Sequence, residues 1–490
     1  MEERLSQRVV KSGLWAFALR AVNRAFSFVR LIILARVLAP EDFGLMGIAL
    51  LTMATLDTFS QTGFQAALIQ KKDDIKSYLD AAWTVLILRG SILFAILYII
   101  APFAAHFFNA KEAEVIIRVI GLSFLIQAFT NIGVIYFEKE LEFNKLFIYS
   151  FVGTLSDFVV AVSAALILKN VWALVFGSLA GSTAMCITSY FIHPYRPKFD
   201  FHLGKAKELF GFGKWILGSS ILIFLITQGD DIFVGKLLGT TALGLYQLAY
   251  RISNMPATEI THVISQVTFP AYSKLQDNLP KLREAYLRTL QFTAFLSIPI
   301  AGLIFILAPD FTRIFLGEKW MPMVPAMQVL AIFGVVRSIG ATFGPIYQAI
   351  NRPDILTKLS FLKLTLLIIL IYPLTIKFGI LGAALATTLP SLFHNSIGAI
   401  LIIRKIICCD SKSFLLPIFV PLISIILTNV VFIYFVNCIS WENHYFTFMF
   451  SIVFISILYT LFFYVLCKVL GYKFKLNYTK NVGVIIDGKL

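Results

Sequence analysis

The first membrane-length stretch of the chain reads Ser12-Gly-Leu-Trp-Ala-Phe-Ala-Leu-Arg20-Ala-Val-Asn23-Arg24-Ala-Phe-Ser27-Phe-Val-Arg30-Leu-Ile-Ile-Leu-Ala-Arg36-Val37. At about 100° per residue, its polar side chains fall within an arc of about 120°: Arg20, Asn23, Arg24, Ser27 and Arg30. An arginine near the bilayer centre costs about 2.5 to 3.5 kcal/mol to insert, so an aligned stripe is expected to face protein or a water-filled cavity. The alternative is that Arg20 and Arg30 snorkel to the interfaces or form structural ion pairs.

The composition indicates that lipid is the solvent of this fold. Of 490 residues, 58% are hydrophobic and 14% are charged, and the mean hydropathy is +0.83, which excludes an ordinary soluble domain. The net charge of +15 does not indicate nucleic-acid binding, because the basic residues lie mainly in short loops where they set the membrane topology. The five cysteines show no metal-ligand spacing, and an internal disulfide is not expected.

Apolar segments divide the chain into about fourteen spans, each close to the 20 residues that a hydrocarbon core of ~30 Å requires. Numbered 1 to 14, they fall near residues 12–37, 44–69, 81–102, 115–137, 146–168, 172–193, 212–238, 242–270, 286–308, 323–350, 356–376, 381–403, 414–436 and 447–468. Segment Met1 to Lys11 is polar and precedes a span with no small-residue cleavage site, so span 1 is expected to stay as an uncleaved anchor.

Loop charges predict the orientation. With the N-terminus inside, most loop lysines and arginines fall on the inner side, and the outer loops hold only Lys111, Lys169, Lys236, Arg313, Lys319 and Lys377. The positive-inside rule therefore places both termini in the cytoplasm. No hydrophilic segment is long enough for a soluble catalytic domain, since the longest run to about 25 residues.

The chain repeats itself at an offset of 200 residues. Gly13-Leu-Trp15 returns as Gly213-Lys-Trp215, and Gly44-Leu45 returns as Gly244-Leu245. We interpret spans 1–6 and 7–12 as two copies of one unit, which run parallel because six is even, and such pairs hold substrate between them. The expected fold is all-α and polytopic, with six-helix lobes at 1–200 and 201–410 around a central cavity, and two extra helices with a cytoplasmic tail at 411–490.

Basic residues outnumber acids inside the spans: Arg20, Arg24, Arg30, Arg89, Arg118, Arg251, Arg337 and Lys363 against Asp57, Asp157, Asp230, Asp231 and Glu259. Buried positive charge is costly unless an anion occupies the site, and the planar guanidinium suits phosphate. The substrate is therefore expected to carry phosphate or carboxylate, and the arginines other than Arg118 are candidate cavity residues. The alternative is that these cations pair permanently with the acids and the remainder snorkel.

Four acids are candidates for ion coupling. Asp230 and Asp231 lie in span 7, where span 1 carries Arg30. Either they take up a proton or sodium ion during transport or they lock the lobes structurally. Asp57 and Asp157 are weaker candidates for lining the cavity. Pro256 is expected to be a hinge in span 8, and His262 and His394 could relay protons or make ordinary polar contacts.

Several motifs resemble those of polysaccharide exporters and O-antigen flippases, the Wzx-like, colanic-acid-exporter type of the superfamily that includes multidrug exporters and the lipid II flippase. They are Leu34-Ala-Arg36-Val-Leu38-Ala-Pro40-Glu41-Asp42-Phe43-Gly44, Gly63-Phe-Gln-Ala-Ala-Leu-Ile-Gln70, Gly244-Leu-Tyr-Gln-Leu-Ala-Tyr-Arg251 and Glu318-Lys-Trp320. The resemblance covers roughly residues 1 to 400.

The resemblance implies a flippase of the bacterial inner membrane that moves polyprenyl-diphosphate-linked oligosaccharides outward by alternating access. It implies cavity-lining roles for six residues: Arg20, Arg24, Arg30, Asp230, Asp231 and Arg251. The expected partners are the lipid-linked oligosaccharide and the bilayer, with H+ or Na+ and a polysaccharide polymerase as further candidates, and with no nucleic acid, metal or cofactor.

Two other functions remain open. A cation-coupled multidrug or small-solute exporter would favour an excess of acids in the cavity, whereas cations are in excess here. A membrane glycosyltransferase, polymerase or ligase would need catalytic acids in a large outer loop, and the outer loops are short.

Overall fold

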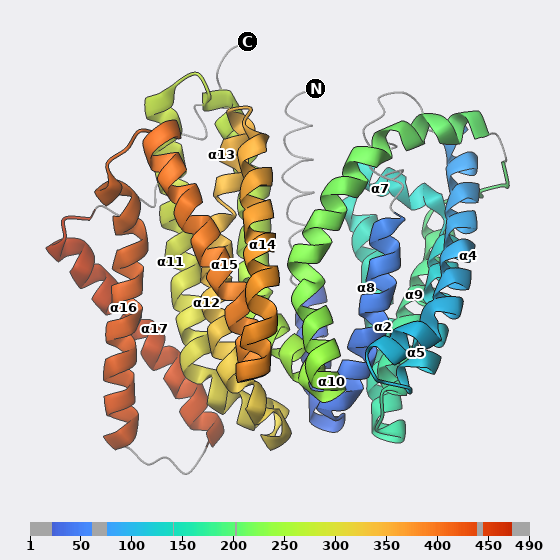
Figure 1. Ribbon diagram of the computed structural model, residues 1–490, viewed down its shortest axis with the longest axis horizontal. Coiled ribbons are helices and arrows are strands. Elements are labelled where there is room, and N and C mark those ends of the chain that lie inside the picture. The colour runs from blue at the N-terminus through green and yellow to red at the C-terminus, as the bar shows by residue number, and fades with distance from the viewer. Residues whose placement is uncertain (1–21, 61–75, 141, 201–202, 439–443, 473–490) are drawn as a thin grey trace. The chain divides into compact units, whose positions relative to one another are not determined.

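The structure is a computed structural model that describes residues 22–60, 76–140, 142–200, 203–438 and 444–472. Within these ranges every regular element is a helix (Figure 1). Arg20 lies outside the described residues, as does the motif that begins at Gly63.

The described helices confirm an all-helical, multi-pass membrane protein. Among the described residues, ten helices are long and apolar enough to cross a membrane, and a bent pair at Ala113–Ala128 and Ile132–Lys139 would be an eleventh span. The surface of the molecule is apolar where a soluble protein would be polar: Phe103 is 71% exposed and Phe191 is 85% exposed. Such side chains are stable at the surface only when lipid covers them.

The chain divides into two compact units. Unit 1 comprises Met1–Gln247 and Phe315–Trp320, and unit 2 comprises Leu248–Ile314 and Met321–Leu490. This division does not test the repeat-based lobes at 1–200 and 201–410, which stay a prediction.

Unit 1 contains the spans of the first copy. Its helices are an unlabelled helix at residues 22–37, α2 (Pro40–Phe59), α4 (Lys76–Phe107), α5 (Ala113–Ile120), α6 (Leu122–Ala128), η1 (Ile132–Val134), α7 (Ile135–Lys139), α8 (Phe143–Leu168), α9 (Trp172–Ile192) and part of α10 (Leu203–Leu275). Helices α8 and α9 pack side by side (Figure 1).

Local sequence sets the two ends of α2. Pro40 is its first residue, and Asp42 accepts a hydrogen bond from the backbone N–H of Ala39 at 2.8 Å. Proline suits the first position because the missing N–H has no intrahelical partner there, and an acid favours the positive end of the helix dipole. The described helix ends at Phe59, ten residues before the predicted end of span 2.

Span 4 is broken where the sequence predicted one helix. The two pieces meet at 69° around Phe129 to Asn131. The carbonyls left free by the break are satisfied by side chains: Tyr190 donates to the Phe129 carbonyl at 2.7 Å, and Trp83 donates to that of Thr130 at 3.1 Å. Asn131 begins the next turn by accepting from the N–H of Gly133 at 2.9 Å. A break inside a membrane protein is stable when its backbone groups are bonded in this way.

Spans 7 and 8 are joined in α10, which breaks at Gly239 with φ +85°. This left-handed conformation costs little for glycine and is unfavourable for other residues. The backbone of Pro256, the expected hinge, stays helical.

Unit 2 contains the rest of α10 and the following helices. They are α11 (Leu279–Phe311), η2 (Thr312–Leu316), η3 (Glu318–Met323), α12 (Val324–Gly340), α13 (Phe343–Ala349), α14 (Pro353–Phe378), α15 (Ile380–Leu401), η4 (Ile402–Ile406), α16 (Ser411–Cys438) and α17 (His444–Val469). Parts of η2 and η3 belong to unit 1 by their contacts.

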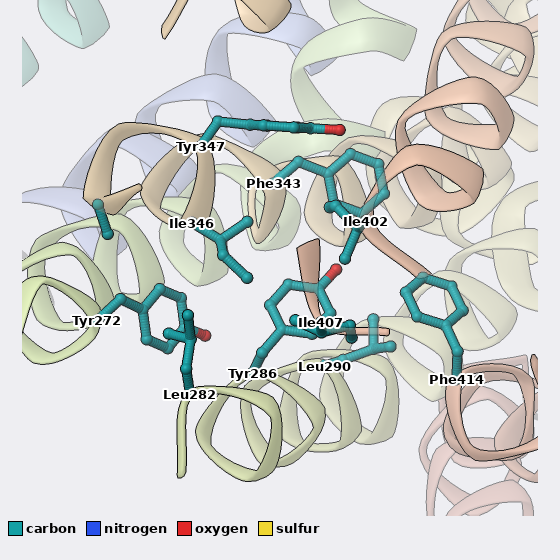
Figure 2. Packing of buried hydrophobic residues seen from close by; sticks show 11 residues of the cluster. Tyr272, Leu282, Tyr286, Leu290, Phe343, Ile346, Tyr347, Ile402, Ile407 and Phe414 are labelled. Carbon is teal, nitrogen blue, oxygen red and sulfur yellow. The ribbon is translucent and has the colours of Figure 1, made fainter. Parts of the chain in front are cut away.

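An apolar cluster holds one end of unit 2 together. Figure 2 shows the ring of Tyr286 at its centre, between Tyr272 and Phe414. The ring centroids lie 6.4 Å and 6.3 Å from that of Tyr286. The buried hydroxyl of Tyr286 lies 3.3 Å from Oγ1 of Thr342, and Tyr347 donates to the carbonyl of Gly398 at 3.1 Å. The cluster therefore joins α10, α11, α13, η4 and α16.

Candidate substrate and ion-coupling residues

Arg30 is held by an ion pair within unit 1. Its Nη2 atom donates to Oδ1 of Asp157 on α8 at 2.9 Å, and the side chains are 16% and 25% exposed. One turn earlier, Phe26 packs edge-on against Phe151 and Phe158 of α8. Because Phe26 and Arg30 both contact α8, the Arg30 side of the stripe is the side that packs on protein. The guanidinium of Arg30 is thereby fixed in position.

The stripe also holds buried polar atoms that no described residue satisfies. Within the described ranges, Nε of Arg30 and Oδ1 of Asn23 are buried without a hydrogen-bond partner. Arg24 is exposed on the same helix. A buried donor and acceptor left open on one helix are costly, and a polar ligand would offset that cost.

Arg89 closes the end of α2. Its Nε donates to the Ser60 carbonyl at 3.0 Å, and its Nη2 donates to Oδ1 of Asp57 at 2.6 Å and to Oγ of Ser60 at 2.8 Å. The last carbonyls of a helix have no intrahelical partners, and a cation there interacts favourably with the negative end of the helix dipole. These contacts favour a structural role for Arg89 and Asp57, and their proposed roles in the cavity remain predictions.

Asp230 and Asp231 are bonded to neutral donors beyond the Gly239 break. Tyr246 donates its hydroxyl to Oδ2 of Asp230 at 2.6 Å, and Gln247 donates Nε2 to Oδ2 of Asp231 at 3.1 Å. Asp230 is only 3% exposed. Neither of these two donors brings a positive charge to the carboxylate that it contacts. The sequence motif Gly244 to Arg251 contains both donors, although their role was not predicted.

The two repeat copies cross at equivalent positions inside unit 1. A Cβ added to Gly44 would lie 1.8 Å from the carbonyl oxygen of Thr240, and one added to Gly244 would lie 1.9 Å from that of Pro40. At the repeat offset of 200, Pro40 corresponds to Thr240 and Gly44 corresponds to Gly244. The two close approaches, Gly44 to Thr240 and Gly244 to Pro40, are therefore equivalent. Only glycine allows backbones to approach this closely. The contact is reciprocal, as a two-fold relation between the copies requires.

Two lysines secure the same region by binding helix ends. Lys319 donates to the carbonyls of Arg36 at 3.0 Å and Leu38 at 2.6 Å, and Trp320 donates to that of Ala35 at 2.8 Å. Lys236, the repeat mate of Arg36, donates to the carbonyl of Phe107 at 2.6 Å. The end of the first helix is therefore bound by a loop of the second copy, and the span 7 end is bound to a loop of the first. These backbone contacts of Lys319 and Lys236 were not predicted from the sequence, although both lysines were assigned to outer loops and Lys319 lies in the Glu318-Lys-Trp320 motif.

The two candidate arginines of unit 2 differ in their surroundings. Arg251 is exposed on α10 and Arg337 is half-buried on α12. Within the described part of the chain, Arg337 makes no hydrogen bond or ion pair. The structure does not test whether any of these arginines contacts substrate.

The polysaccharide biosynthesis protein family matches residues 33–325. The chain belongs to this family. The match begins near the end of the first helix, after Arg30, and includes α2, both acids of α10 and the loop that carries Lys319 and Trp320.

Relatives of this family member support the same assignment. The chain is 25% identical over 423 residues to the lipopolysaccharide biosynthesis protein WzxC of Escherichia coli K12, covering 85% of each chain. It is 27% identical over 408 residues to the probable flippase AglR of Haloferax volcanii, covering 78% of this chain and 81% of AglR. The fold is that of the lipid II flippase MurJ in an inward closed conformation, with a TM-score of 0.75 and 16% identity, covering 93% of this chain and 99% of MurJ.

Proposed function

We propose that this chain is a flippase that moves polyprenyl-diphosphate-linked oligosaccharide units across the bacterial inner membrane for surface polysaccharide biosynthesis. Relatives named for lipopolysaccharide biosynthesis and as a probable flippase support this activity. A flippase, as AglR is named, is a transporter rather than an enzyme. The observation that carries the proposal is the polar stripe of the first helix, where an arginine fixed by Asp157 keeps open donors inside a membrane span.

The diphosphate is the substrate group that the stripe fits best. Arg30 uses one Nη atom on Asp157, and its buried Nε has no partner among the described residues. A guanidinium can donate five hydrogen bonds, so Arg30 can hold Asp157 and a phosphate oxygen at once. Exposed Arg24 lies two turns nearer the inner end and would contact the second phosphate.

Alternating access is the transport mechanism that the repeat contact favours. The Gly44–Gly244 crossing closes the ends of spans 2 and 8, which loop charges assign to the outer side of the membrane. For the cavity to open to the outer side, these backbones would have to separate. The cavity would then close on the inner side. We infer from the same charges that both termini are cytoplasmic, and from the repeat that lobes of 1–200 and 201–410 move with an appendage at 411–490.

A cation-coupled exporter of drugs or small solutes is the second candidate. The observation in its favour is the pair of adjacent acids Asp230 and Asp231 inside α10, which accept hydrogen bonds from a phenol and an amide. The same pair could take up H+ or Na+ to drive the flippase. The double variant Asp230→Asn with Asp231→Asn would then lose ion dependence. Unchanged pH and sodium dependence in that variant would make the acids structural.

Lipid analysis of cells that lack this chain tests the proposal. We expect polyprenyl-diphosphate oligosaccharides to accumulate on the cytoplasmic side and surface polysaccharide to be lost. The glycan that accumulates would identify the substrate. A polysaccharide polymerase on the outer side would use the translocated product, and this partner stays a prediction. Normal lipid intermediates together with lost cation-driven efflux would instead establish the exporter.

A further inference from the structure

Two sequence motifs meet where the first helix ends. One runs from Leu34 to Gly44, and the other is Glu318 to Trp320. The second motif lies in the segment Phe315–Trp320, which belongs to unit 1 by its contacts although the chain on both sides of it belongs to unit 2. The contact between the motifs therefore lies wholly within unit 1. The substrate stripe and the repeat crossing give the second motif no function.

The first motif leaves backbone carbonyls open at the end of the first helix. In a continuing helix, the carbonyls of Ala35 and Arg36 would accept from the N–H groups of residues 39 and 40. The N–H of Ala39 instead donates to Oδ2 of Asp42 at 2.8 Å. Pro40 has no N–H to donate. The sequence of this turn therefore removes both donors that a helix would have supplied.

The second motif supplies donors from two adjacent side chains. Nζ of Lys319 donates to the carbonyls of Arg36 at 3.0 Å and Leu38 at 2.6 Å. Nε1 of Trp320 donates to the carbonyl of Ala35 at 2.8 Å. A cation at the carboxyl end of a helix also interacts favourably with the helix dipole. The two motifs are thus complementary, because one leaves open the acceptors that the other binds.

The two donors differ in their access to water. Trp320 is 0% exposed, and its ring packs edge-on against that of Phe43 with centroids 5.2 Å apart. Lys319 is exposed, so water can replace the two carbonyls as partners of its ammonium group. The contact of Trp320 is therefore suited to a fixed anchor, and the contact of Lys319 is suited to one that opens and closes.

The bound helix end leads directly into the crossing of the two repeat copies. Pro40 follows Leu38 by two residues, and its carbonyl oxygen would lie 1.9 Å from a Cβ added to Gly244. A contact that holds residues 35–38 therefore also holds one side of the crossing. Separation of the crossing would pull on the carbonyls that Lys319 binds.

We propose that Lys319 and Trp320 form a clasp that holds the outer side of the protein closed. Trp320 stays bound to the first helix, and Lys319 releases the carbonyls of Arg36 and Leu38 when the crossing separates. The clasp thereby regulates the equilibrium between the closed and open outer side. This inference rests on the alternating access of the proposed flippase function.

Labelling of a buried cysteine from the outer side tests the clasp. Leu51 lies on α2 seven residues after Gly44, about two turns deeper on the same helix face, and is 4% exposed. Leu51→Cys is introduced into the full chain with its five native cysteines replaced by serine. A membrane-impermeant maleimide added to intact cells should label it slowly while the crossing is closed. The labelling rate then measures opening, and thermal unfolding in detergent identifies the variants that fold.

Variants of the two donors should separate opening from stability. We expect Lys319→Met and Lys319→Gln to raise the labelling rate about tenfold, which is the factor that a hydrogen bond from a charged group contributes to an equilibrium. Lys319→Arg keeps a cationic donor and should label at nearly the rate of the parent chain. Trp320→Phe removes only the anchor's hydrogen bond, so it should lower the unfolding temperature and change the labelling rate of folded protein less than about twofold.

The chain offers a matched control in Lys111→Met, which removes an exposed lysine assigned to an outer loop of the first copy. Unchanged labelling in both neutral variants of Lys319, or an equal rise in Lys111→Met or Trp320→Phe, would overturn the clasp. These results would leave the flippase proposal intact, because lipid analysis tests that proposal separately. Normal lipid intermediates in cells that lack the chain would instead overturn the flippase and leave a tenfold rise in Lys319→Met standing.

Discussion

The two repeat copies make matching backbone contacts near the start of their second spans, and different side chains secure the loop that follows the sixth span of each copy. Gly44 approaches the Thr240 carbonyl and Gly244 approaches the Pro40 carbonyl in a reciprocal contact. After span 6, Asp80 at the start of α4 accepts from the Tyr195 hydroxyl at 2.7 Å. After span 12, Arg283 at the start of α11 donates to the Ile407 carbonyl at 2.7 Å. The loop after the sixth span is thus held by an acidic side chain in the first copy and by a basic side chain in the second copy.

The copies diverge further along their second helices. Asp57 of α2 is bonded to Arg89, and its repeat mate is the buried Ala257, which faces Gly334 of α12. Several buried threonine and serine hydroxyls of unit 2 bond instead to carbonyls of their own helices, as Thr289 does with Ala285 at 3.0 Å. Repetition is therefore retained where backbones meet and lost where side chains carry charge. This teaches that position in the repeat predicts architecture better than it predicts the role of an ionisable residue.

Substitution of a crossing glycine should have the largest effect. Gly44→Ala and Gly244→Ala each place a Cβ within 2 Å of a backbone oxygen, and a backbone cannot yield as a side chain can. We expect a loss of about 3 kcal/mol or more in stability and loss of transport. Thermal unfolding in detergent and translocation in vesicles measure the two effects.

Gly344→Ala is the matched control, because no atom lies within 4 Å of its added Cβ. It lies in α13, where alanine stabilises a helix by up to about 1 kcal/mol relative to glycine. If Gly44→Ala unfolded at the same temperature as Gly344→Ala, the reciprocal crossing would not exist in the folded protein.

Removal of Arg89 should have the next largest effect and tests the divergence between the copies. Arg89→Ala leaves Asp57 and the last carbonyls of α2 without their shared donor, which we expect to cost about 2 to 3 kcal/mol. Transport per folded molecule should stay near that of wild type. Ala257→Ser, at the repeat mate of Asp57, should change stability by less than about 1 kcal/mol if its hydroxyl bonds its own helix. Loss of transport without loss of stability in Arg89→Ala would instead restore Arg89 to the substrate path.

A charge exchange separates the structural and substrate roles of Arg30. Arg30→Ala should reduce transport strongly and also leave Asp157 without its partner. Arg30→Asp combined with Asp157→Arg restores the ion pair but moves the guanidinium to α8. We expect this double variant to regain most of its stability and little transport. Recovery of both would show that Arg30 serves only the ion pair.

Arg24→Lys should retain part of the transport lost in Arg24→Ala, since the positive charge remains while the planar guanidinium fork is lost.

The sequence predicted the all-helical membrane class because hydropathy and the length of a membrane helix are local properties, and the described residues contain ten or eleven of the fourteen expected spans. It also located the repeat, since matching residues recur at one fixed offset. It missed the break in span 4, because Tyr190 and Trp83 satisfy the broken backbone from distant helices. The expected relation between Arg30 and the acids of span 7 stays a prediction, and the sequence did not single out Asp157 as the acid that contacts Arg30 through tertiary packing. The partners of an intramembrane charge depend on which helices adjoin, and a single sequence does not carry that information.

The smallest expected effect concerns the linker that joins the copies. Burial lowers the pKa of His193, and nearby Lys145 and Arg196 lower it further while Glu142 opposes them. Its Nδ1 accepts a hydrogen bond from the N–H of Tyr195 at 3.1 Å, and its ring stacks on Tyr136 with centroids 5.6 Å apart.

Because the pKa of His193 is lowered in the folded state, the stabilisation is complete above the unfolded-state pKa of about 6.5. It is lost as the pH falls through the folded-state pKa. We expect the unfolding temperature of wild type to fall below about pH 6.5, and that of His193→Phe to change less with pH. Parallel pH curves for the two proteins would exclude His193 as the titrating group. The second copy has no histidine in the loop at 404–413, so variants there should leave this pH dependence unchanged.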